Sequence, residues 1–296
     1  MHGLTTSLFS GLTTASLLFL VASGLTLIFG ALRIINVAHG SLYMYGAFLV
    51  SSLVAASAGI NVPASWMFWL ALIVAPLLVA VLGGLMEVLV LRWLYRRNHL
   101  LQLLATFALF YILAGTGLLI WGGQYRSVPL PPVLQGHFML TGGAAFPIYD
   151  GFVMAVALAV GLSMWWLLQR TQLGWRIRAA IEDPEMLAAT GTNVRALFTG
   201  VFTLGALLAG IAGAIVGPTQ SITPGLDAQI LVSAFIVAVI GGLGSVAGAA
   251  LGALIIGLFE TAGVLWAPNF ESAFIYVAMI LVLAIRPWGL LGVAES

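Results

Sequence analysis

Long apolar runs, separated by short polar breaks, make up most of the chain. A helix needs about 20 apolar residues to cross the hydrocarbon core of a bilayer, which is roughly 30 Å thick. Eight apolar runs are long enough for a crossing, and a shorter apolar piece at 228–240 is either a ninth span or half of one. The pattern predicts an all-α fold, a polytopic transmembrane helical bundle of about eight or nine spans, with 1–296 as a single transmembrane domain. The longer runs are 12–32, 40–58, 66–91, 100–121, 149–168, 196–216, 246–266 and 272–286.

Small residues recur along the span at 196–216. Gly205, Ala209, Gly213 and Gly217 follow one another at intervals of four, which places them on one face of a helix. Small side chains allow another helix to approach closely in a membrane, where no hydrophobic force drives helices together. We therefore expect this face to pack against a neighbouring helix.

Composition supports a membrane protein and argues against several other classes. The 296 residues are 62% hydrophobic and only 6% charged, whereas average proteins have about a quarter charged residues. The net charge of +1 implies no nucleic-acid partner. Cysteine is absent, which rules out disulfides and thiolate chemistry, and the four histidines are too dispersed to share a metal ion. No nucleotide-binding, zinc-protease or serine-hydrolase motif is present, so we expect neither an enzyme nor a cofactor.

The arginines predict the orientation of the chain. All ten basic residues are arginine, and positive residues concentrate in cytoplasmic loops. Counting spans places three arginine groups on one face, which we assign to the cytoplasm. The segment 122–148, rich in proline, is then predicted to be an irregular extracellular loop. The three groups are Arg92, Arg96 and Arg97; Arg170, Arg176, Arg178 and Arg195; and Arg286.

The one long polar interruption lies at about 169–195 and contains a predicted short helix. Asp183 suits the N-cap and Pro184 the first helical position, while Gly191 suits the left-handed residue after the last turn. Glu185 adds negative charge near the positive end of the helix dipole. Roughly two turns are too short to be stable alone in water. The segment is either an ordinary loop between spans or a docking helix for a cytoplasmic partner.

Polar residues also break the first apolar region at Arg33–Ser41. Asn36, His39 and Ser41 are costly beside a membrane unless they face protein, a cavity or the interface. The stretch is either a tight cytoplasmic turn or a broken helix that lines a solute path. In the second case Tyr43 and Tyr45 would extend the polar lining.

A matching break lies in the second half at Ile240–Ser245, where three glycines in four residues favour a turn or an unwound segment. Two carboxylates lie within or close to spans and are functional candidates for that reason. For Glu87, near the cytoplasmic end of its span, snorkelling to the interface or pairing with the nearby Arg92 is the favoured interpretation. For Glu260, near the outer end of its span, a place beside the solute path is an open alternative.

These motifs, in this order, resemble the membrane permeases of bacterial ABC importers for branched-chain amino acids, in particular the smaller permease of the Liv-type pair. The resemblance covers nearly the whole chain. It is carried by Gly24–Gly30 with Asn36–Ser41 and Tyr43–Ala47, by Thr171–Gly174 with Arg178, Ala179, Asp183, Ala188 and Gly191, and by Ala209–Gly213 with Gly241–Ser245, Gly248 and Ala249.

The resemblance implies an importer of several parts in the bacterial inner membrane. A second related permease would complete the pore, two cytoplasmic ATP-binding subunits would hydrolyse ATP, and a periplasmic solute-binding protein would deliver the solute. It also implies two sets of site residues. The substrate path would include Asn36, His39, Gly40, Ser41, Tyr43, Gly242, Gly244 and Ser245. The ATPase-coupling set would be Arg176, Arg178, Ala179, Glu182, Asp183, Glu185, Met186, Ala188 and Gly191.

Three alternatives stay open at the level of sequence. Permeases for urea and short amides share these motifs. A stand-alone channel or facilitator would also suit the glycine-rich breaks. An ion-coupled carrier is a further class, although such carriers usually contain relays of ionisable residues within the membrane, and this chain has few.

Overall fold

The computed structural model describes residues 2–59, 62–95, 97–139 and 145–292, and within these ranges it contains eleven α-helices. The all-α prediction is confirmed. Seven helices of the described chain are long and apolar enough to cross a membrane, and α9 and α11 are shorter. The helices are α1 (His2–Leu32), α2 (His39–Ala56), α3 (Ala64–Leu89), α4 (His99–Trp121), α5 (Ile148–Arg170), α6 (Gln172–Glu182), α7 (Pro184–Ala189), α8 (Val194–Val216), α9 (Leu226–Gly241), α10 (Val246–Trp266) and α11 (Glu271–Ile285).

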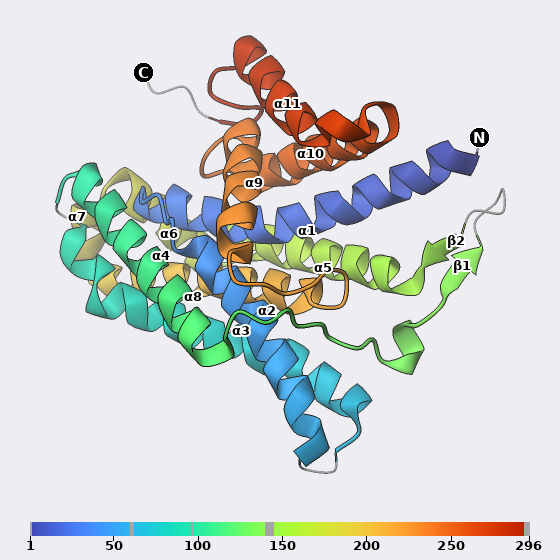
Figure 1. Cartoon of the computed structure of the whole chain (residues 1–296). Coiled ribbons are helices and arrows are strands. Elements are labelled where there is room, and N and C mark those ends of the chain that lie inside the picture. Colours follow the sequence, from blue (N-terminus) through green and yellow to red (C-terminus); the bar gives the residue numbers. More distant parts are fainter. Residues whose placement is uncertain (1, 60–61, 96, 140–144, 293–296) are drawn as a thin grey trace.

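Two helices occupy the centre of the bundle. The buried share of the span is 72% for α1 and 67% for α8, compared with 22% for α4 and 17% for α5. α1 packs against α5, α8, α9 and α10, while α2 and α3 pack on α8. Figure 1 shows α6 and α7 at one end of the bundle, near the C-terminus of α1, and the strands β1 (His137–Met139) and β2 (Ala145–Pro147) at the other. We call these the α7 end and the hairpin end.

The small-residue face of α8 is a packing surface, as the sequence predicts. A methyl group added at Gly24 of α1 would lie 2.6 Å from the carbonyl oxygen of Gly205. One added at Gly46 of α2 would lie equally close, at 2.6 Å, to the carbonyl oxygen of Gly210. A methyl group at Gly213 would overlap the carbonyl oxygen of Tyr43. The backbones of α1, α2 and α8 therefore touch where only glycine fits.

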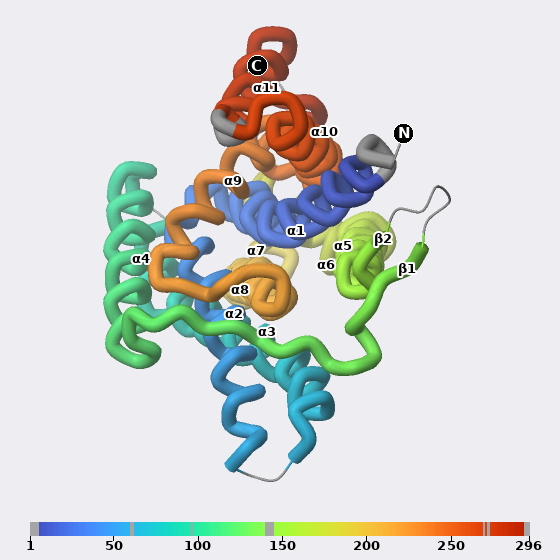
Figure 2. The backbone as a smooth tube through the Cα atoms, turned by 45° about the vertical axis from the view of Figure 1, so that its right-hand side comes forward, coloured from blue at the N-terminus to red at the C-terminus, as the bar shows by residue number. Residues whose placement is uncertain are grey.

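The segment predicted as an irregular loop at 122–148 is partly ordered, so that prediction was incomplete. β1 and β2 pair antiparallel with Phe138 opposite Phe146, and a 3₁₀ turn, η3 (Pro132–Leu134), precedes them. The backbone of Arg126 also pairs with Ile222, which ties the segment to the connection between α8 and α9. Figure 2 shows the segment passing across the bundle in front of α8. The prolines of this segment indicate a loop, so the sequence analysis did not predict these short strand pairings.

The described arginines cluster as the sequence predicts. Arg33 follows α1, Arg92 follows α3, Arg170 ends α5 and Arg195 begins α8. All four positions belong to the α7 end, since α7 lies between α5 and α8 and the ends of α3 and α8 are joined by hydrogen bonds. Arg126 lies at the opposite end, where its backbone pairs with Ile222.

Gly213→Ala should destabilise the protein by about 1–3 kcal/mol, because the new methyl group overpacks the α2–α8 contact. Gly200→Ala on the same helix is the matched control, since no atom lies within 4 Å of the methyl group it would add. Alanine stabilises a helix interior by about 0.5–1 kcal/mol relative to glycine, so the control should be neutral or more stable. Thermal unfolding of the purified protein in detergent measures both, and equal midpoints would contradict the close contact.

Candidate functional site

The break between α1 and α2 lies inside the bundle. Arg33 adopts a left-handed backbone (φ 54°) and turns the chain back after α1. α2 then begins at His39, whose Nε2 lies 3.0 Å from the carbonyl oxygen of Val21, well within α1. Because α2 starts beside the middle of α1, the chain re-enters the bundle before the helix resumes. The break therefore lies inside the bundle and not in a loop at its surface.

Two buried polar side chains at this break have atoms without a hydrogen-bond partner in the described chain. They are Nδ2 and Oδ1 of Asn36 and Nδ1 of His39, and both residues are 0% exposed. A buried polar group without a partner costs about 1–3 kcal/mol. Such groups therefore call for a structural or functional explanation.

The start of α2 meets the start of α9. Ser41 Oγ donates a hydrogen bond of 3.1 Å to Asp227 Oδ2, and Asp227 Oδ1 accepts one of 3.0 Å from the backbone N–H of Ala228. A methyl group at Gly40 would overlap the carbonyl oxygen of Asp227. Asp227 is 1% exposed. Gly40 and Ser41 of the predicted path residues therefore form this junction, and His39 and Tyr43 lie next to them in the first turns of α2.

Sequence reasoning missed Asp227, which is the most buried acidic group at the junction. The available signal was a single carboxylate two residues after Gly225 and at the start of an apolar run. A carboxylate at a helix start also suits the positive end of the helix dipole. The structure adds what the sequence could not show, that this helix start faces α2.

The other predicted path residues lie elsewhere, at the α7 end. A methyl group at Gly244 would lie 3.0 Å from the Cα of Gly30, close to the end of α1. Ser245 Oγ caps α10 by accepting a 3.0 Å hydrogen bond from Gly248 N–H, and Gly242 has a left-handed φ of 100°. These three residues are therefore not brought together with His39, which packs on Val21. Gly244 and Ser245 line an apolar groove of about 820 Å³ between α5 and α10.

The predicted capped helix is confirmed as α7. Asp183 Oδ1 accepts hydrogen bonds of 2.9 Å from the backbone N–H groups of Glu185 and Met186. Gly191 has the expected left-handed φ of 87°. No residue of α7 is buried, and Met186 is 65% exposed. Asp183, Glu185, Met186, Ala188 and Gly191 are all exposed, so this short helix offers a free surface at its end of the bundle.

The residues before α7 form a second helix, α6, which the sequence analysis did not predict. Its buried residues are Gly174, Ile177 and Ala180, a spacing of three that marks one helix face. Arg178 Nη1 donates a 2.6 Å hydrogen bond to the carbonyl oxygen of Leu168, which fastens α6 to α5. Of the other predicted coupling residues, Arg176 and Glu182 are exposed and Ala179 is half-buried.

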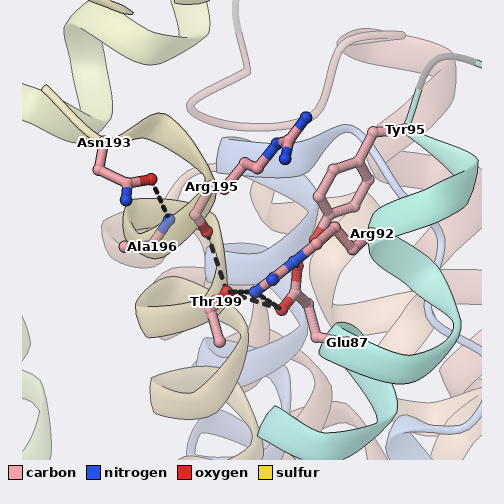
Figure 3. Close-up of polar contacts among 7 residues, drawn as sticks. All are labelled: Glu87, Arg92, Tyr95, Asn193, Arg195, Ala196 and Thr199. Carbon is pink, nitrogen blue, oxygen red and sulfur yellow. Dashed lines mark hydrogen bonds and ion pairs between the residues drawn. The ribbon is translucent and has the colours of Figure 1, made fainter.

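A buried carboxylate joins α3 to the start of α8 (Figure 3). Glu87 is 0% exposed, and Arg92 Nη2 lies 3.2 Å from its Oε2, which confirms the predicted pairing. Tyr95 donates a 2.7 Å hydrogen bond to Glu87 Oε1. Thr199 Oγ1 lies 2.7 Å from Glu87 Oε2 and accepts a 2.6 Å hydrogen bond from Arg92 Nη2. We call these four residues the Glu87 cluster.

The Glu87 cluster fixes the helix that leaves α7. Asn193 caps α8 through a 3.0 Å hydrogen bond from Ala196 N–H, and Thr199 lies a short way along the same helix. Burial, and then the hydrogen bond and charge of Glu87, raise the pKa of Tyr95 well above its usual value. The phenol therefore stays protonated and keeps donating. A displacement of the start of α8 would have to break these bonds or carry the end of α3 with it.

Residues 7–283 match the protein family described as "Branched-chain amino acid transport system / permease component". The chain belongs to this family. It is 29% identical to the high-affinity branched-chain amino acid transport system permease protein BraD of Pseudomonas aeruginosa, over 97% of this chain and 95% of that protein. It is 27% identical to LivH of Escherichia coli over the same shares, 97% and 95%. A probable LivH of Methanocaldococcus jannaschii is 30% identical over 94% of this chain and 90% of that protein.

No solved structure matches the chain. Membership of a permease family and the seven long apolar helices of the described residues make this a multi-pass membrane protein. The family match runs across α1 to α11. It therefore includes the α2–α9 junction, α7 and the Glu87 cluster.

Arg92→Gln should destabilise this permease, because it leaves the Glu87 carboxylate buried without its cation. Removing one partner of a buried pair costs about 3–5 kcal/mol. Since the Arg92 side chain is 28% exposed, we expect about 2 kcal/mol. The double variant Glu87→Gln/Arg92→Gln should lose less than the sum of the two single losses. Denaturant unfolding in detergent measures all three, with the exposed Arg97→Gln as control, and strict additivity would contradict the cluster.

Proposed function

We propose that this chain is the permease subunit of an ATP-binding-cassette importer that carries branched-chain amino acids across a bacterial inner membrane. The similarity to branched-chain amino acid permeases along nearly the whole chain carries this proposal. It favours these solutes over urea or short amides. The sequence has no ATP-binding motif, so the energy comes from partner subunits: a second related permease completes the pore, two cytoplasmic ATPases bind the α7 end, and a periplasmic solute-binding protein delivers the amino acid.

In this proposal α7 is the element that the ATPase grips. Its exposed surface and its cap on Asp183 support that role. A helix of two turns is not stable alone, and only Leu187 of α7 packs partly against the bundle, so a partner would stabilise the rest of its surface. Met186 and Ala188 supply an apolar contact, while Glu182 and Glu185 set the register through charge. Motion at α7 passes into α8, and the Glu87 cluster passes it on to α3.

The α2–α9 junction belongs to the solute path in this proposal. Unpartnered atoms of Asn36 and His39 and the buried Asp227 support the assignment. Polar groups at helix breaks inside a bundle are the usual means by which transporters contact polar solutes. Gly242, Gly244 and Ser245 would line the solute path at the α7 end, in the connection between α9 and α10.

The double variant Asp183→Ala/Glu185→Arg should uncouple the importer. Loss of the cap costs the helix on the order of 1 kcal/mol, and the new positive charge opposes the helix dipole and a complementary partner surface. We expect normal insertion with a roughly tenfold fall in solute-stimulated ATP hydrolysis, which corresponds to about 1.4 kcal/mol of docking free energy. Solute-stimulated ATP hydrolysis is measured with the reconstituted complex, and a pull-down with the permease measures how much ATPase stays bound.

Asn98→Ala is the matched control for this experiment. Asn98 caps α4 at the same end of the bundle through a 2.9 Å hydrogen bond from Leu101 N–H. The control therefore removes an equivalent cap outside α7 and should leave ATPase stimulation near normal. Normal stimulation and pull-down in the α7 variant would remove α7 from the coupling role. A stand-alone facilitator would show solute flux without any ATPase.

Single cysteines at Asn98 and Ser127 should label from opposite sides of the membrane. Both positions are exposed, and they lie at the α7 end and the hairpin end respectively. The native chain has no cysteine, so each label reports one site. An impermeant reagent added to intact cells should modify Ser127→Cys and not Asn98→Cys. Modification of both from outside would overturn the proposed orientation.

A further inference from the structure

A second cavity lies between α9, α10 and α11. Its volume is about 330 Å³. Figure 2 shows these three helices gathered on one side of α1, away from α3. The cavity lies towards the hairpin end, because Glu260 comes after Gly257, which packs on Gly11 near the start of α1. The lining residues are Gln229, Val232, Ser233, Ile236, Glu260, Ile275 and Tyr276.

The lining combines two kinds of chemistry. Glu260 contributes a carboxylate, and Gln229, Ser233 and Tyr276 contribute an amide and two hydroxyl groups. The remaining three side chains are branched aliphatic groups, namely Val232, Ile236 and Ile275. Sites for small ligands characteristically join apolar walls to a few polar groups that fix orientation.

One helix face supplies most of the wall. Gln229, Val232, Ser233 and Ile236 follow one another at helical spacing along α9. This face differs from that of the peripheral helix α5, where Leu158, Leu162, Trp165 and Trp166 are exposed. A carboxylate, an amide and a serine within spans are costly against lipid. The α9–α11 face is therefore better suited to a water-filled path than to the bilayer.

We propose that this cavity binds the imported amino acid as it enters the permease. Glu260 pairs with the ammonium group, and Gln229 and Ser233 hydrogen-bond the carboxylate. Val232, Ile236 and Ile275 enclose the branched aliphatic side chain. The assignment rests on the proposed function, since it names where in the permease that solute is recognised.

α9 connects this cavity to the buried junction described above. Gln229 lines the cavity, and Asp227, two residues earlier in the same first turn, accepts a hydrogen bond from Ser41 of α2. A ligand that pulls on the first turn of α9 therefore acts directly on the α2–α9 contact. In this proposal, ligand binding in the cavity is therefore coupled to the position of the break between α1 and α2.

Val232→Phe tests the cavity through solute selectivity. The complete importer is reconstituted in proteoliposomes, and uptake is started by adding binding protein saturated with either leucine or valine. Because the binding protein is saturated in both cases, the ratio of the leucine uptake rate to the valine uptake rate reports on the permease. The added ring narrows the cavity and should lower leucine uptake relative to valine uptake by about tenfold, since one methylene in a hydrophobic site changes rates by roughly 10–200-fold. Val264→Phe is the matched control, because Val264 and Val232 are both 48% exposed and Val264 lies outside the lining.

Glu260→Gln tests the ammonium contact. Leucine uptake should fall about tenfold or more, with normal complex assembly, because the bound ammonium group loses its counter-charge. Asp150→Asn, an equivalent change in the first turn of α5, should leave uptake near the wild-type rate.

The outcomes separate the two levels of the proposal. If the wild-type importer transports none of leucine, isoleucine and valine, the proposed function itself is wrong. Wild-type transport with an unchanged leucine-to-valine ratio in Val232→Phe and unchanged uptake in Glu260→Gln overturns the cavity assignment alone. If Glu260→Gln instead blocks assembly with the second permease while Val232→Phe keeps the wild-type ratio, the face is a subunit interface and the assignment is also wrong.

Discussion

Direct backbone contact along α8 is the constraint on which the rest of the bundle depends. Gly205 of α8 meets Gly24 of α1, and Gly210 meets Gly46 of α2, at distances that leave no room for a Cβ atom. In a membrane such contacts replace the hydrophobic force that assembles soluble bundles. They also bring α1 and α2 onto one helix, so the break between them is held inside the bundle rather than at its surface. The polar groups of that break are buried as a consequence.

The same helix is continuous with the element at the α7 end. α8 begins five residues after the end of α7, and the Glu87 cluster joins its first turns to α3. Close packing along the length of a helix resists bending, because protein interiors are dense and transmit strain. A force on α7 would therefore reach α1 and α2 as a displacement of α8 as a whole. Buried pairs such as Glu87 with Arg92 specify one such arrangement through their geometry more than through their net stability.

Sequence patterns predicted the features that depend on local chemistry. Apolar run length predicted the long spans, and the Asp183–Pro184 pair with Gly191 predicted α7, because caps and left-handed glycines act over a few residues. The patterns did not predict α6, since its buried face of Ile177 and Ala180 is short and lies among charges. They also missed Asp227 and the separation of Gly244 from His39. Those features depend on which helices meet, and nothing in a single run of residues states that Ser41 will face the start of α9.

The short helices explain how a bundle this apolar can hold polar groups in its interior. α9 has 16 residues, fewer than the roughly 20 that a full crossing needs, so its first turn must lie within the bundle. α2, with 18 residues from His39, also begins inside. Two helix starts brought together concentrate their free N–H groups, and the positive ends of both dipoles favour a carboxylate. Asp227 supplies that negative charge at the junction, and Ser41 fixes its direction. A path between the two ends of the bundle that passes this point would therefore meet a buried carboxylate whose two oxygens already accept hydrogen bonds from Ser41 and Ala228.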